Sequence, residues 1–206
     1  MSDIEKIIND AWENKDQVNQ NSDQLLKDAI NQVVNDLDSG KSRVAEKING
    51  EWVTHQHLKK AIMLSFRIHG METLAGPYSS WRDKSNILKG KTAGWGDKEF
   101  EQAGFRMVPN SPVRKGSFIG KNVVLMPCFV NIGAYIDQGT MMDTFSRAGS
   151  YCQIGKNYIN RAYACLELID DRNASYINLD ALTLIADNAW SAGVILGNPI
   201  KNWEKA

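Results

Sequence analysis

The sequence predicts an α+β protein in which a helical region with one hairpin precedes a parallel β-helix. Three observations predict this fold. Over positions 1–70, apolar side chains return at the spacing of helix faces. The pair Asn49-Gly50 divides a stretch of alternating polarity, which is typical of a β-hairpin. From Gly116 to Ile154, two sets of residues return every six positions, a period that fits neither a helix nor a hairpin.

The helical region is expected to span residues 1–70. Ser2-Asp3 can cap a first helix, and a second helix from Ser22 should stop at the turn signal 38–40. A third helix is expected near 57–68, after the hairpin. The first helix carries an apolar face, which consists of Ile4, Ile7, Ile8, Ala11 and Trp12. Such faces pack against other elements, so we interpret this region as structural.

Residues 71–112 are expected to link the two regions. They contain Gly, Lys and Trp without a clear period, and one short helix is predicted at 97–104. We interpret Trp81 and Trp95 as packing residues rather than as a platform for a ligand.

The six-residue period defines the predicted β-helix, residues 113–157. The apolar set is Phe118, Val124, Val130, Ile136, Met142, Ala148 and Ile154, and the small or turn-tolerant set is Gly116, Asn122, Cys128, Ala134, Thr140, Ser146 and Cys152. Each hexad would supply one short strand and one turn, and three such units would close a triangular coil. Successive coils would stack about 4.8 Å apart. We expect the apolar set to face inward and the small set to lie at the corners.

Composition excludes several classes of function. Lys plus Arg and Asp plus Glu both number 24 in the 206 residues, so no excess positive charge favours nucleic acid or a membrane surface. No apolar run is long enough to span a bilayer. The cysteines Cys128, Cys152 and Cys165 lack metal-type spacing and are expected to be reduced in a cytoplasmic protein.

No metal site is predicted. His55 and His57 flank Gln56, but no third ligand follows at a suitable spacing, so a capping or surface role is favoured. His69 is a lone loop histidine. The glycines of "NIGAYIDQG" fall at coil turns and do not form a phosphate-binding loop.

Residues 104–144, "GFRMVPNSPVRKGSFIGKNVVLMPCFVNIGAYIDQGTMMDT", closely resemble the tetrahydrodipicolinate N-succinyltransferase family of hexapeptide-repeat acyltransferases. The stretch "SGKSRVAEKINGEWVTHQHLKKAIMLSFRI" resembles the N-terminal region of the same family. The resemblance implies a left-handed β-helix in a homotrimer with active sites between subunits. It also implies transfer of a succinyl group from succinyl-CoA to tetrahydrodipicolinate, in lysine and diaminopimelate biosynthesis. Succinyl-CoA would be a cosubstrate, with no metal and no tightly bound cofactor.

Two residues match family positions that bind the acceptor. Arg106, in "GFR", matches the arginine that binds the dicarboxylate, and a guanidinium can pair with a carboxylate through two hydrogen bonds. Asp143, in "GTMMDT", matches an aspartate that could orient or deprotonate the attacking amine. From the residues alone, Arg106 could instead form a surface or interface ion pair and Asp143 could be an ordinary turn residue. The residues that bind the acyl-CoA remain unknown.

Beyond residue 157 the six-residue period is lost, and 158–206 form a divergent tail with a helix predicted at 179–189. Two explanations stay open: a shortened copy with impaired activity, or a replacement segment that caps the β-helix. The alternative function, from a different class, is a catalytically inactive β-helix protein that only self-associates. Phe145 stands where the family usually has Trp, and Tyr151 is expected to strain a coil corner.

Overall fold

The computed structural model describes residues 3–76 and 78–155, together with the backbone of strands 163–169 and 191–199. The chain divides into two compact units, Met1–Tyr158 and Ile159–Ala206. The first unit combines helices with short strands, which confirms the predicted α+β class. In the second unit, β13 (Tyr163–Ile169) pairs with β14 (Ser191–Pro199) in antiparallel fashion. The helix predicted at 179–189 lies outside the described residues.

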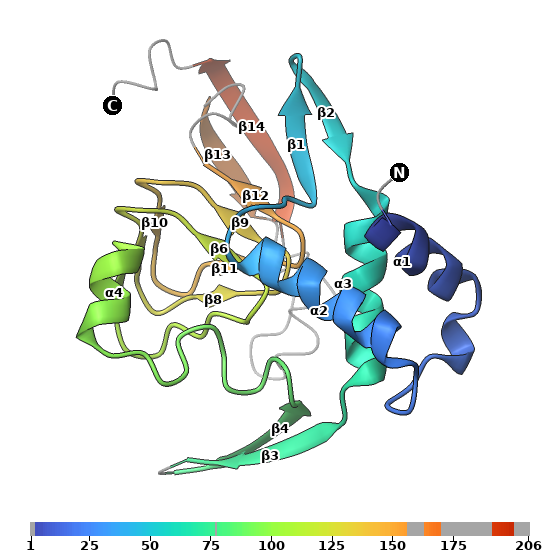
Figure 1. The fold of residues 1–206 in the computed structure, drawn as a ribbon. Coiled ribbons are helices and arrows are strands. Elements are labelled where there is room, and N and C mark those ends of the chain that lie inside the picture. The colour runs from blue at the N-terminus through green and yellow to red at the C-terminus, as the bar shows by residue number, and fades with distance from the viewer. Residues whose placement is uncertain (1–2, 77, 156–162, 170–190, 200–206) are drawn as a thin grey trace, which may run out of the picture. The chain divides into compact units, whose positions relative to one another are not determined.

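The N-terminal helices confirm the prediction from apolar spacing. They are α1 (Asp3–Glu13), α2 (Gln24–Asp38) and α3 (Gln56–Ile68), with a short 3-10 helix, η1 (Lys15–Gln17), after α1. The three α-helices lie against one another in Figure 1 and share one apolar core. Its fully buried side chains include Ile8, Ile30, Ile62 and Leu64. No helix in the described ranges is long and apolar enough to cross a membrane.

The predicted hairpin joins β1 (Ala45–Ile48) to β2 (Glu51–Thr54), with Ile48 paired to Glu51. Asn49 and Gly50 have φ angles of 53° and 86°. Both therefore occupy the left-handed region that a two-residue hairpin turn requires, which Asn and Gly adopt at the lowest cost.

A second hairpin was not predicted. It joins β3 (Met71–Ala75) to β4 (Ser80–Lys84) and projects on one side of the unit in Figure 1. The short helix α4 (Asp97–Ala103) follows it and ends at Gly104, whose φ is 70°. Next to α4, the Trp95 ring packs edge-on against Phe100 at 5.3 Å between centroids, as expected of a packing residue.

The region with the six-residue period forms two-residue strands that pair in parallel. The strands are β5 (Arg106–Met107), β6 (Phe118–Ile119), β7 (Val124–Leu125), β8 (Phe129–Val130), β9 (Tyr135–Ile136), β10 (Met141–Met142), β11 (Arg147–Ala148) and β12 (Gln153–Ile154). They form small sheets of order β10-β7-β5, β11-β8 and β12-β9-β6. From β6 onward, every third strand thus returns to the same sheet, so that Phe118 pairs with Tyr135 and Val124 with Met141. We call this region the stack.

The inward-facing register is shifted by one residue at the start of the stack. Phe118 and Val124, expected inside, are only partly buried, and Ile119 and Leu125 take the interior positions. From Val130 onward the expected residues face inward. The interior columns, in register order, are Met107–Leu125–Met142, Val113–Val130–Ala148 and Ile119–Ile136–Ile154.

The shift has its cause at Pro127. Interior residues are six apart, except that Val130 follows Leu125 by five. Three residues before each interior residue, the backbone has a positive φ, at Gly104, Asn110, Gly116, Asn122, Gly133, Gly139, Phe145 and Tyr151. At the short step this position is Pro127, whose ring excludes positive φ. The small set is displaced by the same one residue at the start of the stack. Gly116 and Asn122 are corner residues with a left-handed backbone, and the residues after them, Ser117 and Val123, are fully buried.

Tyr151 lies at a coil corner, where its bulk was expected to strain the packing, and its side chain packs outside the stack. Its ring lies against Gly133 and packs on the core of the helices. A Cβ atom at position 133 would come within 2.8 Å of this ring, so glycine is needed for the contact. Tyr151 has a φ of 70°, which shows that the strain lies in its backbone.

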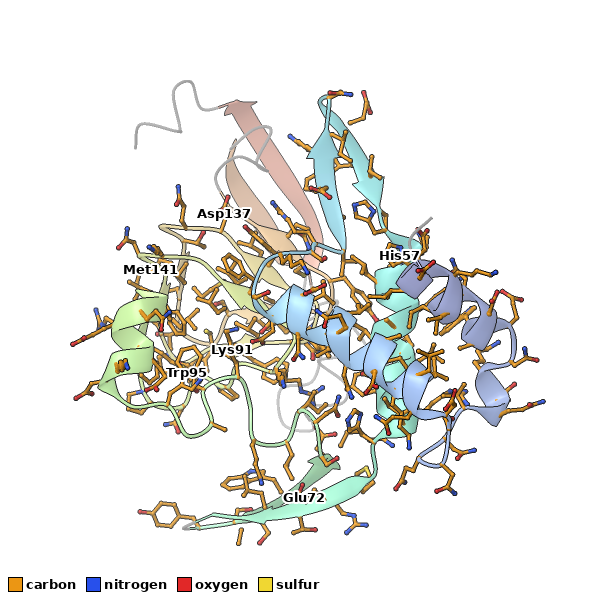
Figure 2. All side chains as sticks on the ribbon, in the orientation of Figure 1. His57, Glu72, Lys91, Trp95, Asp137 and Met141 are labelled. Atoms are coloured by element: carbon orange, nitrogen blue, oxygen red, sulfur yellow. The ribbon has the colours of Figure 1, made fainter. Side chains whose placement is uncertain are left out.

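Asp38, the last residue of α2, connects the helices to the stack. Its Oδ1 accepts the backbone N–H of Gly116 at 2.8 Å, and its Oδ2 accepts Lys91 Nζ at 2.8 Å. The Lys91 side chain is only 7% exposed, so this ion pair is largely shielded from water (Figure 2). The pairing fixes the end of α2 against the first turns of the stack.

Candidate substrate-binding face

Arg106 opens the first strand of the stack. It is exposed, whereas Met107, the next residue of β5, turns inward. Its backbone N–H donates to Val123 O at 2.9 Å, which fixes the strand against β7. Among the described residues, no hydrogen bond or ion pair holds the Arg106 guanidinium. The surface ion pair considered from the sequence is therefore not formed there.

Asp143 follows β10 at a corner of the stack. Its Oδ1 accepts the backbone N–H of Thr144 at 2.7 Å, and its carbonyl accepts Ser146 Oγ at 2.6 Å. These are the contacts of a turn residue, as the alternative interpretation proposes. They occupy only one carboxylate oxygen within the described part of the chain, and the residue is exposed. The other oxygen can receive a proton or a hydrogen bond from a ligand.

The sheet β5-β7-β10 relates these two residues. Arg106 pairs with Val124, and Val124 pairs with Met141, so Arg106 and Met141 lie two strands apart. Two strand spacings amount to about 10 Å. Asp143 lies two residues beyond Met141, and no ion pair joins it to Arg106 in the described ranges. We call this surface, from Arg106 through Val124 and Met141 to Asp143, the β5–β10 face.

Two exposed apolar side chains border Asp143 and were not assigned to a site from the sequence. Met141 (Figure 2) is 60% exposed, and Phe145 is 92% exposed. Met141 immediately precedes the interior residue Met142, and in a two-residue strand this position faces outward. A large apolar residue at an outward position is the sequence signal by which Met141 could have been identified as part of a site. Apolar side chains next to a carboxylate exclude water from any ligand that lies between them.

The histidines lie away from the β5–β10 face. His55 Nε2 lies 2.8 Å from Glu46 Oε1, and His57 Nδ1 lies 3.6 Å from Glu5 Oε1. Burial lowers the pKa of His57; the nearby Glu5 carboxylate opposes this shift, and His55 adds to it. His69 Nδ1 contacts the carbonyl of Ser65 at 2.8 Å. In the parts of the chain that the structure describes, no three His, Cys, Asp or Glu side chains are grouped as metal ligands would be.

The cysteines whose side chains the structure describes are packing residues, as expected. Cys128 is buried in the stack, and burial raises the pKa of its thiol. Cys152 packs against the same core at a corner. Cys165 lies on β13.

The protein is of the class in which a helical N-terminal region precedes a stack of short parallel β-strands with a six-residue period. Residues 3–68 match the family profile described as "Tetrahydrodipicolinate N-succinyltransferase N-terminal". Over the part covered by this match and by the relatives described next, the chain is similar to the tetrahydrodipicolinate N-succinyltransferase family.

Curated relatives with the name 2,3,4,5-tetrahydropyridine-2,6-dicarboxylate N-succinyltransferase are similar over most of this chain. The protein from Pelagibacter ubique is 66% identical over 138 residues, which are 67% of this chain and 50% of the relative. The proteins from Parvibaculum lavamentivorans and Sodalis glossinidius are 50% and 49% identical, each over 76% of this chain and over 56% and 57% of their own lengths. The chain thus spans about half the length of the curated relatives it matches.

Proposed function

We propose that the chain is an acyltransferase that moves the succinyl group of succinyl-CoA to the amine of ring-opened tetrahydrodipicolinate. The observation that carries the proposal is the β5–β10 face. It presents a guanidinium that is unpaired among the described residues, together with a carboxylate, on one side of the stack, in a chain similar to named N-succinyltransferases. The reaction belongs to lysine and diaminopimelate biosynthesis, and the proposed location is the cytoplasm.

The proposed scaffold is a left-handed parallel β-helix of hexapeptide repeats. Two findings support it: strands three repeats apart pair in parallel, and a positive φ recurs at the corners with the period of the repeat. Three flat sides and three tight corners in each coil account for both. The finer division into a helical domain (1–70), a linking region (71–112), the β-helix (113–157) and a tail (158–206) is part of this proposal.

Arg106 is proposed to bind a carboxylate of the acceptor. Its guanidinium presents parallel N–H donors that match the two oxygens of a carboxylate. The side chain is exposed and unpaired among the described residues, so a ligand need not displace a competing carboxylate. A dicarboxylate held in this way would extend along the outer ladder Arg106–Val124–Met141 towards Asp143.

Asp143 is proposed to orient the acceptor amine and to take its proton. The amine nitrogen must be neutral to attack the thioester carbonyl. In the reaction a C–N bond forms, the C–S bond breaks, and coenzyme A leaves as the thiolate. The amine proton passes to a base, which returns it to the sulfur to give the thiol. The oxygen of Asp143 that is not bonded to Thr144 can hold that proton. Its neighbour Thr144 keeps the carboxylate in place.

The proposed assembly is a homotrimer, with each active site completed by a neighbouring subunit. Arg106 and Asp143 support this because both lie on an outer surface of the stack and not in an enclosed cavity of one subunit. The proposal includes no metal and no tightly bound cofactor, because succinyl-CoA supplies the acyl group as a cosubstrate.

The decisive experiment measures thiol release from succinyl-CoA by the full chain, with and without tetrahydrodipicolinate. Release that depends on the acceptor supports the proposal. Background release from a folded protein, checked by circular dichroism, contradicts the transferase and favours the inactive, self-associating protein.

A matched pair of variants assigns the carboxylate. Asp137 (Figure 2) occupies the equivalent corner after β9, and its Oδ1 accepts the next backbone N–H at 2.9 Å, just as in Asp143. Asp143→Asn should lower kcat by about a hundredfold, the scale of general-base catalysis, whereas Asp137→Asn should leave it unchanged. Equal losses in both variants would indicate a structural role for these corner residues.

A further inference from the structure

A polar cavity of about 460 Å³ lies where the helices, the end of β4 and the stack meet. Its wall comes from α2, from the residue after α3, from the turn after β4 and from the loop before β6. The described wall includes no residue of the β5–β10 face. The volume falls within the range of small-molecule sites. The lining residues are Asn31, Val34, Asn35, His69, Ser85, Asn86 and Lys115.

The composition of this wall favours a polar ligand with a negative charge. Val34 is the one apolar residue among the described lining residues, and the others are three asparagines, a serine, a histidine and a lysine. No Asp or Glu belongs to the described wall, so with His69 neutral its charge is that of Lys115 alone. A cationic group in a cleft attracts anions when no carboxylate neutralises it.

Most of the polar lining residues have no partner within the described part of the chain. The side chains of Asn31, Asn35, Ser85 and Lys115 form no hydrogen bond or ion pair there. Asn31, Asn35 and Lys115 are exposed. A ligand would therefore compete with water for these groups and would not have to displace a contact of the protein.

His69 is held in one orientation at the wall. Its Nδ1 lies 2.8 Å from the carbonyl oxygen of Ser65, and because a carbonyl oxygen only accepts, Nδ1 carries the hydrogen. In the neutral ring Nε2 then remains available as an acceptor. The backbone carbonyl of His69 accepts Lys84 Nζ at 3.0 Å, which fixes this residue beside the end of β4. Nε2 can therefore accept a hydrogen bond from a hydroxyl group of a ligand.

Asn86 gives an independent indication of a ligand. Both polar atoms of its side chain, Oδ1 and Nδ2, are buried and have no hydrogen-bond partner among the described residues. A buried amide without partners is unfavourable, and native structures contain few of them. Because Asn86 also lines the cavity, a rotation of its amide would bring these two atoms to a molecule bound there.

We propose that this cavity binds a small sugar phosphate, a molecule with several hydroxyl groups and one phosphate monoester. Lys115 pairs with the phosphate, to which a lysine binds as a point charge, and the Ser85 hydroxyl donates to the same group. Each asparagine amide has a donor and an acceptor, and each sugar hydroxyl also has both, so the two kinds of group are complementary. His69 accepts from a further hydroxyl.

Calorimetric titration of the full chain with glucose 6-phosphate tests the proposal, without a measurement of succinyl transfer. Saturable binding is expected. Glucose lacks the charge and inorganic phosphate lacks the hydroxyl groups, so both should bind at least about tenfold more weakly. No saturable binding of glucose 6-phosphate at millimolar concentration would overturn the proposal. Equally tight binding of glucose would also overturn it, because Lys115 would then have no part in recognition.

Matched variants locate the site. Lys115→Ala and Asn35→Ala should each weaken binding of glucose 6-phosphate about fivefold, as for the loss of one partly exposed contact. Lys98→Ala removes an exposed lysine of α4, and Gln32→Ala removes an exposed amide of α2 that bonds to Asp36; neither residue lines the cavity. Both controls should bind as the unmodified chain does. An unchanged affinity in the Lys115→Ala/Asn35→Ala double variant would overturn the proposal.

Asn86→Leu tests the buried amide separately. Since the amide has no partner without the ligand, an apolar side chain of similar shape should leave the thermal midpoint of the free chain unchanged or raise it. The affinity for glucose 6-phosphate should fall about fivefold, because the ligand loses the amide as a partner. A lower midpoint with an unchanged affinity would show that Asn86 acts only in the fold, which would contradict its place in the site.

Discussion

The guanidinium of Arg43 lies over the ring of Tyr135, 3.7 Å from its centroid. Arg43 precedes β1 at the end of the helical region, and Tyr135 faces outward on β9. Nε and Nη2 of the same guanidinium donate to Gln153 Oε1 on the adjacent strand β12, at 3.1 and 2.8 Å. One arginine therefore connects the helical region to two neighbouring strands of the stack.

Replacing Arg43 by Lys should lower the free energy of unfolding by about 1–2 kcal/mol. An ammonium group keeps the charge but cannot both lie flat on the ring and donate two N–H bonds to one oxygen. Urea denaturation followed by circular dichroism measures the change. Arg67→Lys is the control, since its contact with Asp16 is largely exposed and should contribute almost nothing. Equal effects of the two substitutions would show that the Arg43 geometry is not stabilising.

The corrected interior register predicts different costs for two neighbouring residues. Leu125 is fully buried between Met107 and Met142, so Leu125→Ala should destabilise the protein by about 2–5 kcal/mol. Val124 faces outward, and Val124→Ala should cost less than about 1 kcal/mol. Urea midpoints of the two variants decide between the registers. A larger loss for Val124→Ala would restore the register expected from the six-residue count.

The two aromatic corner residues should respond in opposite directions to substitution by Asn. Phe145 has a φ of 59° and is 92% exposed. The packing energy of its side chain is therefore too small to offset the strain in its backbone. Asn tolerates this conformation better, and Phe145→Asn should stabilise the fold by about 0.5–1 kcal/mol.

Tyr151 shares the left-handed backbone but packs on Gly133 and on the core of the helices. Tyr151→Asn should therefore destabilise the protein, because the lost packing exceeds the relief of strain. Thermal unfolding of both variants compares the two effects. Stabilisation by both substitutions would mean that the Tyr151 ring contributes no packing energy.

If Arg106 binds the acceptor, Arg106→Lys should raise the KM for tetrahydrodipicolinate by about tenfold with little change in the KM for succinyl-CoA. Lysine provides charge without the paired donors. Arg147 is also an exposed arginine at the first position of a two-residue strand, but it lies in the β11-β8 sheet. Arg147→Lys should leave both constants unchanged. Initial rates at varied concentrations of each substrate distinguish these outcomes.

His57 should make stability depend on pH. Its pKa is lowered in the folded state, so between the folded value and the unfolded value of about 6.5 the unfolded chain binds more protons. The contribution of His57 is complete above about pH 6.5 and is lost as the pH falls through this window. Urea midpoints at about pH 7.5 and 5.5 should show a smaller drop in His57→Gln than in the unmodified chain. An identical drop would assign the effect to other groups.

Local signals explain which elements could be predicted. The helices and the first hairpin follow from apolar spacing and from Asn49-Gly50, because each depends on neighbours in sequence. The β3–β4 hairpin escaped prediction because most of its positions are exposed, so no alternation between buried and exposed residues marks it. The register shift at Pro127 was hidden because Val123, Val124 and Leu125 are all apolar, and either phase fits the pattern.

The candidate sites also differ in whether the sequence could predict them. A six-residue period with three sides brings positions three repeats apart to one sheet, which is why Arg106 and the strand before Asp143 could be expected near each other. The polar cavity beside Asn86 could not be foreseen, because helices, turn and stack meet there only after each has folded.

Paired strands of the stack are always three repeats apart in the sequence, and this constant separation affects how the protein folds. Each new turn closes a loop of only three repeats on the turn before it, as from Val124 to Met141. The entropy of loop closure therefore does not grow as the stack lengthens. Parallel sheets usually fold slowly because distant segments must meet. Here assembly can proceed as linear growth from the first turn, which Asp38 fixes, and we expect the formation of that first turn to be the slow step.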